Sequence, residues 1–85
     1  MAGYEIFFKE SVYKELKSIP KIDLKKILSQ IEQLADDPRP TGCRKLTGFE
    51  LYRVRQGQYR IVYSIQDNRL LINVVKIGHR KDVYR

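Results

Sequence analysis

Apolar residues in the first half of the chain recur every three or four positions, which is the spacing of an amphipathic helix. The longer stripe consists of Leu24, Ile27, Leu28, Ile31, Leu34 and Ala35. A shorter stripe of Val12, Leu16 and Ile19 follows Ser11, a typical N-cap residue, and precedes Pro20, which cannot continue a helix. We therefore predict two helices that form an antiparallel hairpin, with their apolar stripes packed against a sheet.

Elsewhere the pattern is that of strands. Residues 4–8 form a short aromatic run, and residues 51–55 and 58–65 flank Gln56-Gly57, which predicts a hairpin with a two-residue turn. Residues 70–77 are the most apolar run, typical of a central strand, and Gly78 is expected to end it. The order predicts one α+β domain over residues 1–85, with the helical hairpin on a four-stranded, mainly antiparallel sheet.

Arginines occupy alternate positions of the predicted hairpin. Because successive side chains of a strand point to opposite faces, Arg53, Arg55 and Arg60 fall on the face away from the apolar residues. With Gln56-Gly57 as the turn, Arg53 lies directly opposite Arg60. Like charges opposite each other cost up to about 1 kcal/mol. A face that binds phosphate has a reason to accept this cost, since guanidinium groups grip phosphate through two parallel hydrogen bonds. Arg44 and Lys45 are expected to extend this surface.

The distribution of charge supports a polyanion partner. Residues 1–40 contain seven Lys/Arg and seven Asp/Glu, whereas residues 41–85 contain ten Lys/Arg and three Asp/Glu. The whole net charge of +7 therefore lies in the second half of the chain. A basic surface of this kind favours nucleic acid. The alternative is a basic protein that is merely soluble.

Composition excludes several other classes. Cys43 is the only cysteine, so no internal disulfide can form, and its Pro/Gly-rich connector favours an incidental thiol over a nucleophile. One His and one Cys argue against a metal site. There is no apolar run long enough for a membrane span and no signal-peptide core at the start. We expect a cytoplasmic protein without a cofactor.

The element order and three motifs, LYRVR, GQYRIVY and VVKIGHRKDVYR, resemble the RelE/ParE superfamily of toxins from toxin–antitoxin pairs. The likeness covers nearly the whole chain and is closer to the RelE branch. RelE-type toxins cleave mRNA in the ribosomal A site, whereas ParE-type toxins inhibit DNA gyrase. The resemblance therefore implies a ribosome-dependent endoribonuclease that needs no metal, with a cognate antitoxin, the ribosome and mRNA as partners. A ParE-like inhibitor and a non-catalytic nucleic-acid-binding module stay open.

The resemblance also implies roles for individual residues. Arg60 and Arg80 match arginines that stabilise charge at the scissile phosphate, and Tyr84 matches a tyrosine that stacks on a base and helps to activate the 2′-hydroxyl. Arg53 and Arg55 stand where RelE has lysines, and an arginine that stays protonated is unsuited to be the general base. His79 is a candidate acid because imidazole can carry a proton. The remaining predicted RNA-binding residues are Arg44, Lys45, Lys81 and Arg85.

Overall fold

The computed structural model describes residues 3–79, which form one five-stranded sheet and two helices. The strands are β1 (Glu5–Phe8), β2 (Arg44–Lys45), β3 (Tyr52–Gln56), β4 (Tyr59–Gln66) and β5 (Leu71–His79). Their order in the sheet is β1-β5-β4-β3-β2, with β1 parallel to β5 and every other pair antiparallel. The predicted α+β class is confirmed. The sheet has one strand more than the four predicted, because the two residues of β2 pair with β3.

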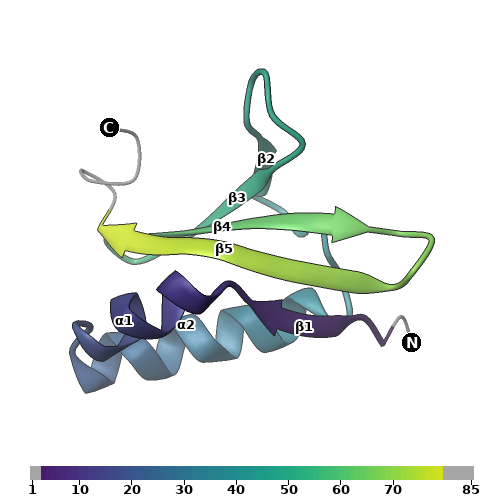
Figure 1. The fold of residues 1–85 in the computed structure, drawn as a ribbon. Coiled ribbons are helices and arrows are strands. Elements are labelled where there is room, and N and C mark those ends of the chain that lie inside the picture. The colour runs from purple at the N-terminus through teal and green to yellow at the C-terminus, as the bar shows by residue number, and fades with distance from the viewer. Residues whose placement is uncertain (1–2, 80–85) are drawn as a thin grey trace.

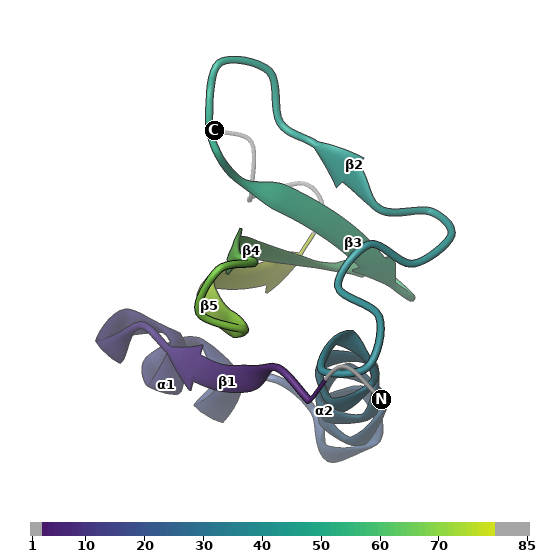
Figure 2. The ribbon, with the colours of Figure 1, turned by 90° about the vertical axis from the view of Figure 1, so that its right-hand side faces the viewer.

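Both helices lie on the same side of the sheet (Figures 1 and 2). α1 (Glu10–Lys17) follows β1 directly, and α2 (Lys21–Leu34) runs back beneath the sheet (Figure 1). The backbone N–H of Tyr4 donates to the carbonyl of Ala35 at 3.0 Å, so the end of α2 meets the start of β1. The two helices are therefore antiparallel, as predicted.

The starts of the helices differ in detail from the prediction. α1 begins one residue before Ser11, with Lys9 at the N-cap position and no side-chain cap. Ser11 was therefore wrongly predicted as the cap, and it lies in the first turn of α1. Pro20 is the N-cap of α2, where its fixed φ of −55° suits the entry into a helix.

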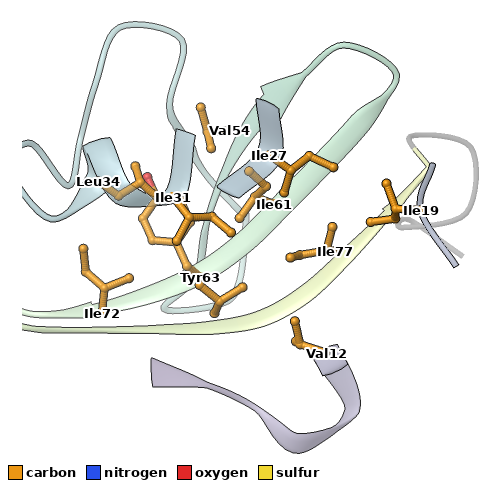
Figure 3. Packing of buried hydrophobic residues seen from close by; sticks show 11 residues of the cluster. Val12, Ile19, Ile27, Ile31, Leu34, Val54, Ile61, Tyr63, Ile72 and Ile77 are labelled. Atoms are coloured by element: carbon orange, nitrogen blue, oxygen red, sulfur yellow. The ribbon is translucent and has the colours of Figure 1, made fainter. Parts of the chain in front are cut away.

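The core lies between α2 and the inner face of the sheet, as Figure 3 shows. α2 contributes Ile27, Ile31 and Leu34, which are at most 3% exposed. The residues they pack with include Val12, Ile61, Tyr63, Ile72 and Ile77. Leu28, which belongs to the predicted apolar stripe of α2, is 42% exposed and lies outside this core. The stripe is therefore wider than the surface that the sheet covers.

The β3–β4 hairpin turns one residue later than predicted. Gln56 pairs with Tyr59, so the two turn residues are Gly57 and Gln58. Gly57 has a φ of +61°, which a type II′ hairpin turn requires at its first central position and which glycine adopts without strain. The consequence is a changed register: Arg60 lies opposite Arg55, not opposite Arg53.

β5 contains a bulge that reorients its second half. Val62 pairs with Lys76, whereas Tyr63 pairs with Val74, so Val75 is the extra residue. The strand continues through Gly78 to His79, and the prediction that Gly78 ends it was wrong. Beyond the bulge, Ile77 lies in the core and Gly78 falls directly opposite Arg60.

Glu15 of α1 fixes this second half of β5. β1 pairs with β5 only as far as Val74, so beyond this point no strand of residues 3–79 pairs with the outer edge of β5. There the backbone N–H of Ile77 donates to Glu15 Oε1 at 2.9 Å, and Lys76 Nζ lies 2.7 Å from Glu15 Oε2. One carboxylate thus satisfies a backbone donor of the strand edge and pairs with the neighbouring cation.

Candidate nucleic-acid interface

Four arginines lie on the face of the sheet opposite the helices. In β3 and β4 the core residues Val54 and Ile61 point toward the helices, so their sequence neighbours point the other way. Arg55 pairs with Arg60, and Arg44 of β2 pairs with Arg53. We refer to Arg44, Arg53, Arg55 and Arg60 as the arginine face. The prediction that three of these arginines share one face agrees with the structure, and β2 adds the fourth.

The arginine face consists of two cross-strand pairs of like charge, Arg44 with Arg53 and Arg55 with Arg60. None of the four strands β2, β3, β4 and β5 contains an Asp or a Glu. Each like-charged pair costs stability, up to about 1 kcal/mol. The sheet therefore concentrates positive charge at one place, where a bound anion would remove the repulsion.

Two of these arginines are held in place rather than extended into solvent. Arg53 and Arg60 are only 8% and 9% exposed. Arg53 Nη1 donates to the carbonyl of Gly42 at 3.3 Å, and a guanidinium has further N–H groups that point elsewhere. An open pocket of about 420 Å³ lies here, lined by Thr41, Gly42, Arg44, Arg53, Val54 and Arg55. A pre-positioned guanidinium loses little entropy when it binds an anion.

The segment that carries Thr41, Gly42 and Arg44 is tied to the core by Tyr63. The Tyr63 hydroxyl donates to the carbonyl of Pro38 at 2.7 Å and lies 3.1 Å from the sulfur of Cys43. Burial, and next the contact with Cys43, raise the pKa of Tyr63, so its hydroxyl keeps its proton and remains a donor. Cys43 therefore packs beside the buried hydroxyl of Tyr63.

Arg39 ties the same segment to the far end of the sheet. Its Nη2 lies 3.0 Å from Asp67 Oδ2, and its guanidinium carbon lies 5.1 Å from the centre of the Tyr52 ring. The Tyr4 hydroxyl donates to the other carboxylate oxygen of Asp67 at 2.7 Å. The hydrogen bonds from Arg39 and then from Tyr4 lower the pKa of Asp67. Charge on Asp67 therefore favours the folded state.

Asp67 is expected to make stability depend on pH in acid. The pKa of Asp67 is lower in the folded chain than in the unfolded chain, so the ionised carboxylate stabilises the fold at pH values above the unfolded pKa of about 4. This stabilisation is lost as the pH falls through the pKa of the folded chain. The stability difference between the wild type and Asp67→Asn should be constant near neutral pH and shrink below about pH 4. Urea unfolding of both proteins at pH values from neutral to below about 4 measures this stability difference. A difference that does not change with pH would contradict the assignment.

Two predicted site residues lie away from the arginine face. Lys45 pairs with Tyr52, so its side chain leaves the sheet on the helix side, where Glu50 lies 2.9 Å away and raises the pKa of Lys45. His79 pairs with Tyr59, which packs on the core, and the two rings meet edge to face at 5.9 Å. The structure therefore does not bring Lys45 or His79 together with the four arginines.

The other predicted site residues, Arg80, Lys81, Tyr84 and Arg85, lie outside the described residues. The described part of β5 ends beside Arg60, since Gly78 is the pairing partner of that residue. Glycine has no side chain, so Gly78 itself places only backbone opposite Arg60.

Sequence reasoning missed the parts of the site that depend on long-range pairing. A strand of two residues, such as β2, is too short for periodicity to reveal, and its pairing with Arg53 shows only in the structure. Thr41 and Gly42 gave no chemical signal in the sequence, although the positive φ of Gly42, +91°, marks a backbone conformation typical of glycine. Glu15 likewise gave no signal before its contact with β5 was seen.

The described residues 3–79 contain no cluster of His, Cys, Asp and Glu that could hold a metal ion. No helix in that part of the chain is both long and apolar enough to cross a membrane. The chemistry that the arrangement itself offers is binding and charge stabilisation by guanidinium groups.

Comparison with known proteins adds independent information. Residues 6–84 match a family described as the ParE toxin of type II toxin–antitoxin systems, parDE. A candidate toxin, RelE1, of Methanocaldococcus jannaschii is 34% identical over 96% of each chain. A candidate RelE-like toxin protein of Escherichia coli is 30% identical, over 95% of this chain and 90% of the relative. Among solved structures, the archaeal RelE–RelB complex of Pyrococcus horikoshii contains a chain that superposes with a TM-score of 0.83 at 30% identity, over 95% of this chain and 99% of that one.

The fold, the arginine face and these similarities define a toxin of the type II toxin–antitoxin class. The chain belongs to the RelE/ParE superfamily, as its motifs indicated. The named relatives are RelE-like, whereas the matching family carries the ParE description. Membership in the superfamily therefore does not by itself identify the biochemical target of the toxin.

Proposed function

We propose that this toxin is a ribosome-dependent endoribonuclease that cleaves mRNA in the ribosomal A site. The observation that carries the proposal is the arginine face, on which two cross-strand arginine pairs stand together on strands without any Asp or Glu. Such a surface suits a ligand with successive phosphates. Mapping the ends of mRNA after incubation with translating ribosomes tests the proposal.

In the proposed reaction the RNA supplies its own nucleophile. The 2′-oxygen attacks the adjacent phosphorus, the bond from phosphorus to the 5′-oxygen breaks, and the products are a 2′,3′-cyclic phosphate and a 5′-hydroxyl. One proton leaves the 2′-hydroxyl and one reaches the 5′-oxygen. Arg60, buried and flanked by Arg55, stabilises the extra negative charge on the phosphorane.

We assign the proton transfers to the segment beyond β5. Arginine stays protonated, so Arg53 and Arg55 cannot remove a proton. The edge-to-face contact of His79 with Tyr59, on the helix side of the sheet, argues against His79 as the acid. Tyr84 is proposed as the base, since arginines beside it would stabilise its phenolate. Without a strong base in reach, cleavage depends on the ribosome to hold the RNA near its attack geometry.

RNA binding is expected to weaken steeply with salt. Each phosphate that the arginine face neutralises should lower log K by about 0.7 per unit of log salt for single-stranded RNA. Replacing Arg44 and Arg53 by Gln should flatten this slope, because one cross-strand pair no longer contributes. Fluorescence anisotropy with a short RNA at several salt concentrations measures both values. Equal slopes for the wild type and the double variant would contradict binding through this face.

A second candidate is inhibition of DNA gyrase without RNA cleavage, which the ParE description of the matching family favours. A supercoiling assay with purified gyrase separates the two. A ParE-like toxin would stop supercoiling and leave mRNA intact on translating ribosomes, whereas the proposed endoribonuclease would do the reverse. A non-catalytic nucleic-acid-binding module would do neither.

A cognate antitoxin is proposed as the partner that controls this activity. The archaeal structure to which the chain is similar is a complex of RelE with RelB. A partner that covers the arginine face must bring negative charge, given the net charge of +7.

A further inference from the structure

Three side chains from adjacent strands form a row across the sheet, beside the arginine face. Asn73 of β5 pairs with Ser64 of β4 on one side and with Phe7 of β1 on the other. The strands β1, β5 and β4 lie next to one another in this order (Figure 1). We refer to Phe7, Asn73 and Ser64 as the outer row. Phe7 is 47% exposed and the other two are partly exposed, so a ligand can reach all three.

The direction of the outer row follows from its neighbours in the sequence. Each of its three residues stands between two residues that belong to the core or pack against it. These six neighbours are Ile6, Phe8, Tyr63, Ile65, Ile72 and Val74. Because successive side chains of a strand point to opposite faces, the outer row points away from the helices. It therefore shares its face of the sheet with the four arginines.

The outer row begins close to Arg53. Arg53 pairs with Val62, and Ser64 is the next residue of β4 on the same face. Such diagonal neighbours lie about 7–8 Å apart, which is within reach of a long side chain. Neighbouring strands are about 4.8 Å apart, so the row extends roughly 10 Å from Ser64 to Phe7. An RNA strand with one phosphate at Arg53 can therefore place the adjoining base over the row.

The outer row offers the groups that hold an unpaired base. Asn73 is the only polar residue between Leu70 and Val75, although asparagine is depleted in strands. Within residues 3–79 the side chains of Asn73 and Ser64 make no hydrogen bond. The Asn73 carboxamide has N–H donors beside a carbonyl acceptor, a pattern that pairs with a base edge, typically that of adenine. Phe7 supplies an aromatic ring on which a base can stack.

Other occupants suit the outer row less well. A protein partner would bury one large apolar side chain, Phe7, and would also have to satisfy the amide of Asn73. Double-stranded RNA keeps its base edges paired and its bases stacked on one another, so it would leave both groups unused. An unpaired base uses the ring and the amide together, and its phosphate meets the neighbouring arginines.

We propose that the outer row is a base-binding subsite for single-stranded RNA, with adenine as its preferred base. The base stacks on Phe7 and pairs with the carboxamide of Asn73, while Arg53 holds the adjoining phosphate. The hydroxyl of Ser64 supplies one further hydrogen bond. The arginine face then provides affinity that is independent of sequence, and the outer row discriminates between bases. This inference rests on the proposed binding of RNA by the arginine face.

The first test compares two fluorescent probes that differ only in their bases. One is a short adenosine oligonucleotide with 2′-O-methyl groups, which block cleavage, and the other is the same sugar–phosphate chain without bases. Fluorescence anisotropy should show that the wild type binds the adenine probe at least about tenfold more tightly. The adenine probe should also bind more tightly than a uracil probe of the same length.

Substitutions then locate the base. Asn73→Leu keeps the size of the side chain but removes its hydrogen bonds, and it should lower the advantage of the adenine probe at least about threefold. Asn68→Leu is the matched control, since Asn68 is exposed in the turn between β4 and β5. Phe7→Leu should also lower the advantage, whereas Phe7→Tyr keeps an aromatic ring and should bind as the wild type does. Affinity for the baseless probe should stay the same in all four variants, which shows that the fold and phosphate binding are intact.

Several results would overturn the subsite. They are equal binding of the adenine and baseless probes, no binding of any probe, unchanged binding by Asn73→Leu and Phe7→Leu, or an equal loss in Asn68→Leu. Amide NMR shifts of Phe7 and Asn73 on concentrating the toxin alone, without shifts on adding the adenine probe, would assign the row to a second copy and also overturn it.

Mapping of mRNA ends on ribosomes separates this inference from the proposed function. Cleavage on ribosomes without any effect of the variants on probe binding would support the endoribonuclease and remove the subsite. The predicted probe binding without cleavage on ribosomes would contradict the endoribonuclease and leave the subsite in place. If both hold, Asn73→Leu should still cleave, but with a changed distribution of bases around the cut.

Discussion

Arg60→Ala is expected to lower the rate of mRNA cleavage on ribosomes by about 10²–10³-fold, the loss typical when one preorganised group is removed from a developing charge. Arg60 is suited to this role because it is buried and has Arg55 directly opposite in the register. Its position is fixed before the substrate arrives, so little reorganisation is needed when the phosphorane forms. The measurement is a single-turnover cleavage time course, with RNA affinity determined in parallel. Cleavage should fall far more than affinity.

Arg69→Ala is the matched control for Arg60→Ala. Arg69 is an exposed arginine in the turn between β4 and β5, so its removal changes the net charge equally without touching the arginine face. The Arg69→Ala variant should cleave mRNA at close to the wild-type rate, because Arg69 lies in a turn away from the arginine face. Thermal unfolding of both variants shows whether the buried substitution has altered the fold. Equal, small losses in the two variants would remove Arg60 from the catalytic role.

Ile27→Ala is expected to destabilise the protein by about 2–5 kcal/mol. Ile27 is fully buried at the centre of the contact between α2 and the sheet (Figure 3). The substitution leaves a cavity that the surrounding side chains fill only in part. A domain of this size has a total stability of only about 5–15 kcal/mol, so the variant should be close to unfolding at moderate urea concentrations.

Leu28→Ala, at the next residue of the same helix, should cost less than about 1 kcal/mol. The two substitutions remove side chains of equal size, and they differ in burial, because Leu28 is 42% exposed. Urea titrations followed by circular dichroism measure both. Similar losses for the two variants would mean that Leu28 belongs to the core.

Local pattern predicted most of the architecture. The helical spacing from Leu24 to Leu34 indicated α2, and the alternating residues from Tyr52 onward indicated the arginine-bearing hairpin. These elements could be recognised because each buries one face, and the period of the apolar residues reports which face that is. The fold class and the shared face of Arg53, Arg55 and Arg60 follow from this information alone.

Register and bulges could not be predicted in the same way. The turn at Gly57-Gln58 differs by one residue from the expected position, and that shift exchanges Arg53 for Arg55 as the partner of Arg60. The extra residue Val75 turns the end of β5 over, which places Gly78 opposite Arg60 and His79 on the helix side. Both features depend on how strands fit across the sheet, which single-strand periodicity does not contain.

The most direct test of the central claim is to map the 5′ ends of mRNA fragments at single-nucleotide resolution in a translating extract supplied with the purified toxin. The account predicts new 5′-hydroxyl ends confined to the codon in the A site of stalled or elongating ribosomes, with none on naked mRNA under the same conditions and none after Arg60→Ala. Intact mRNA, or breaks scattered alike over free and ribosome-bound RNA, would contradict it.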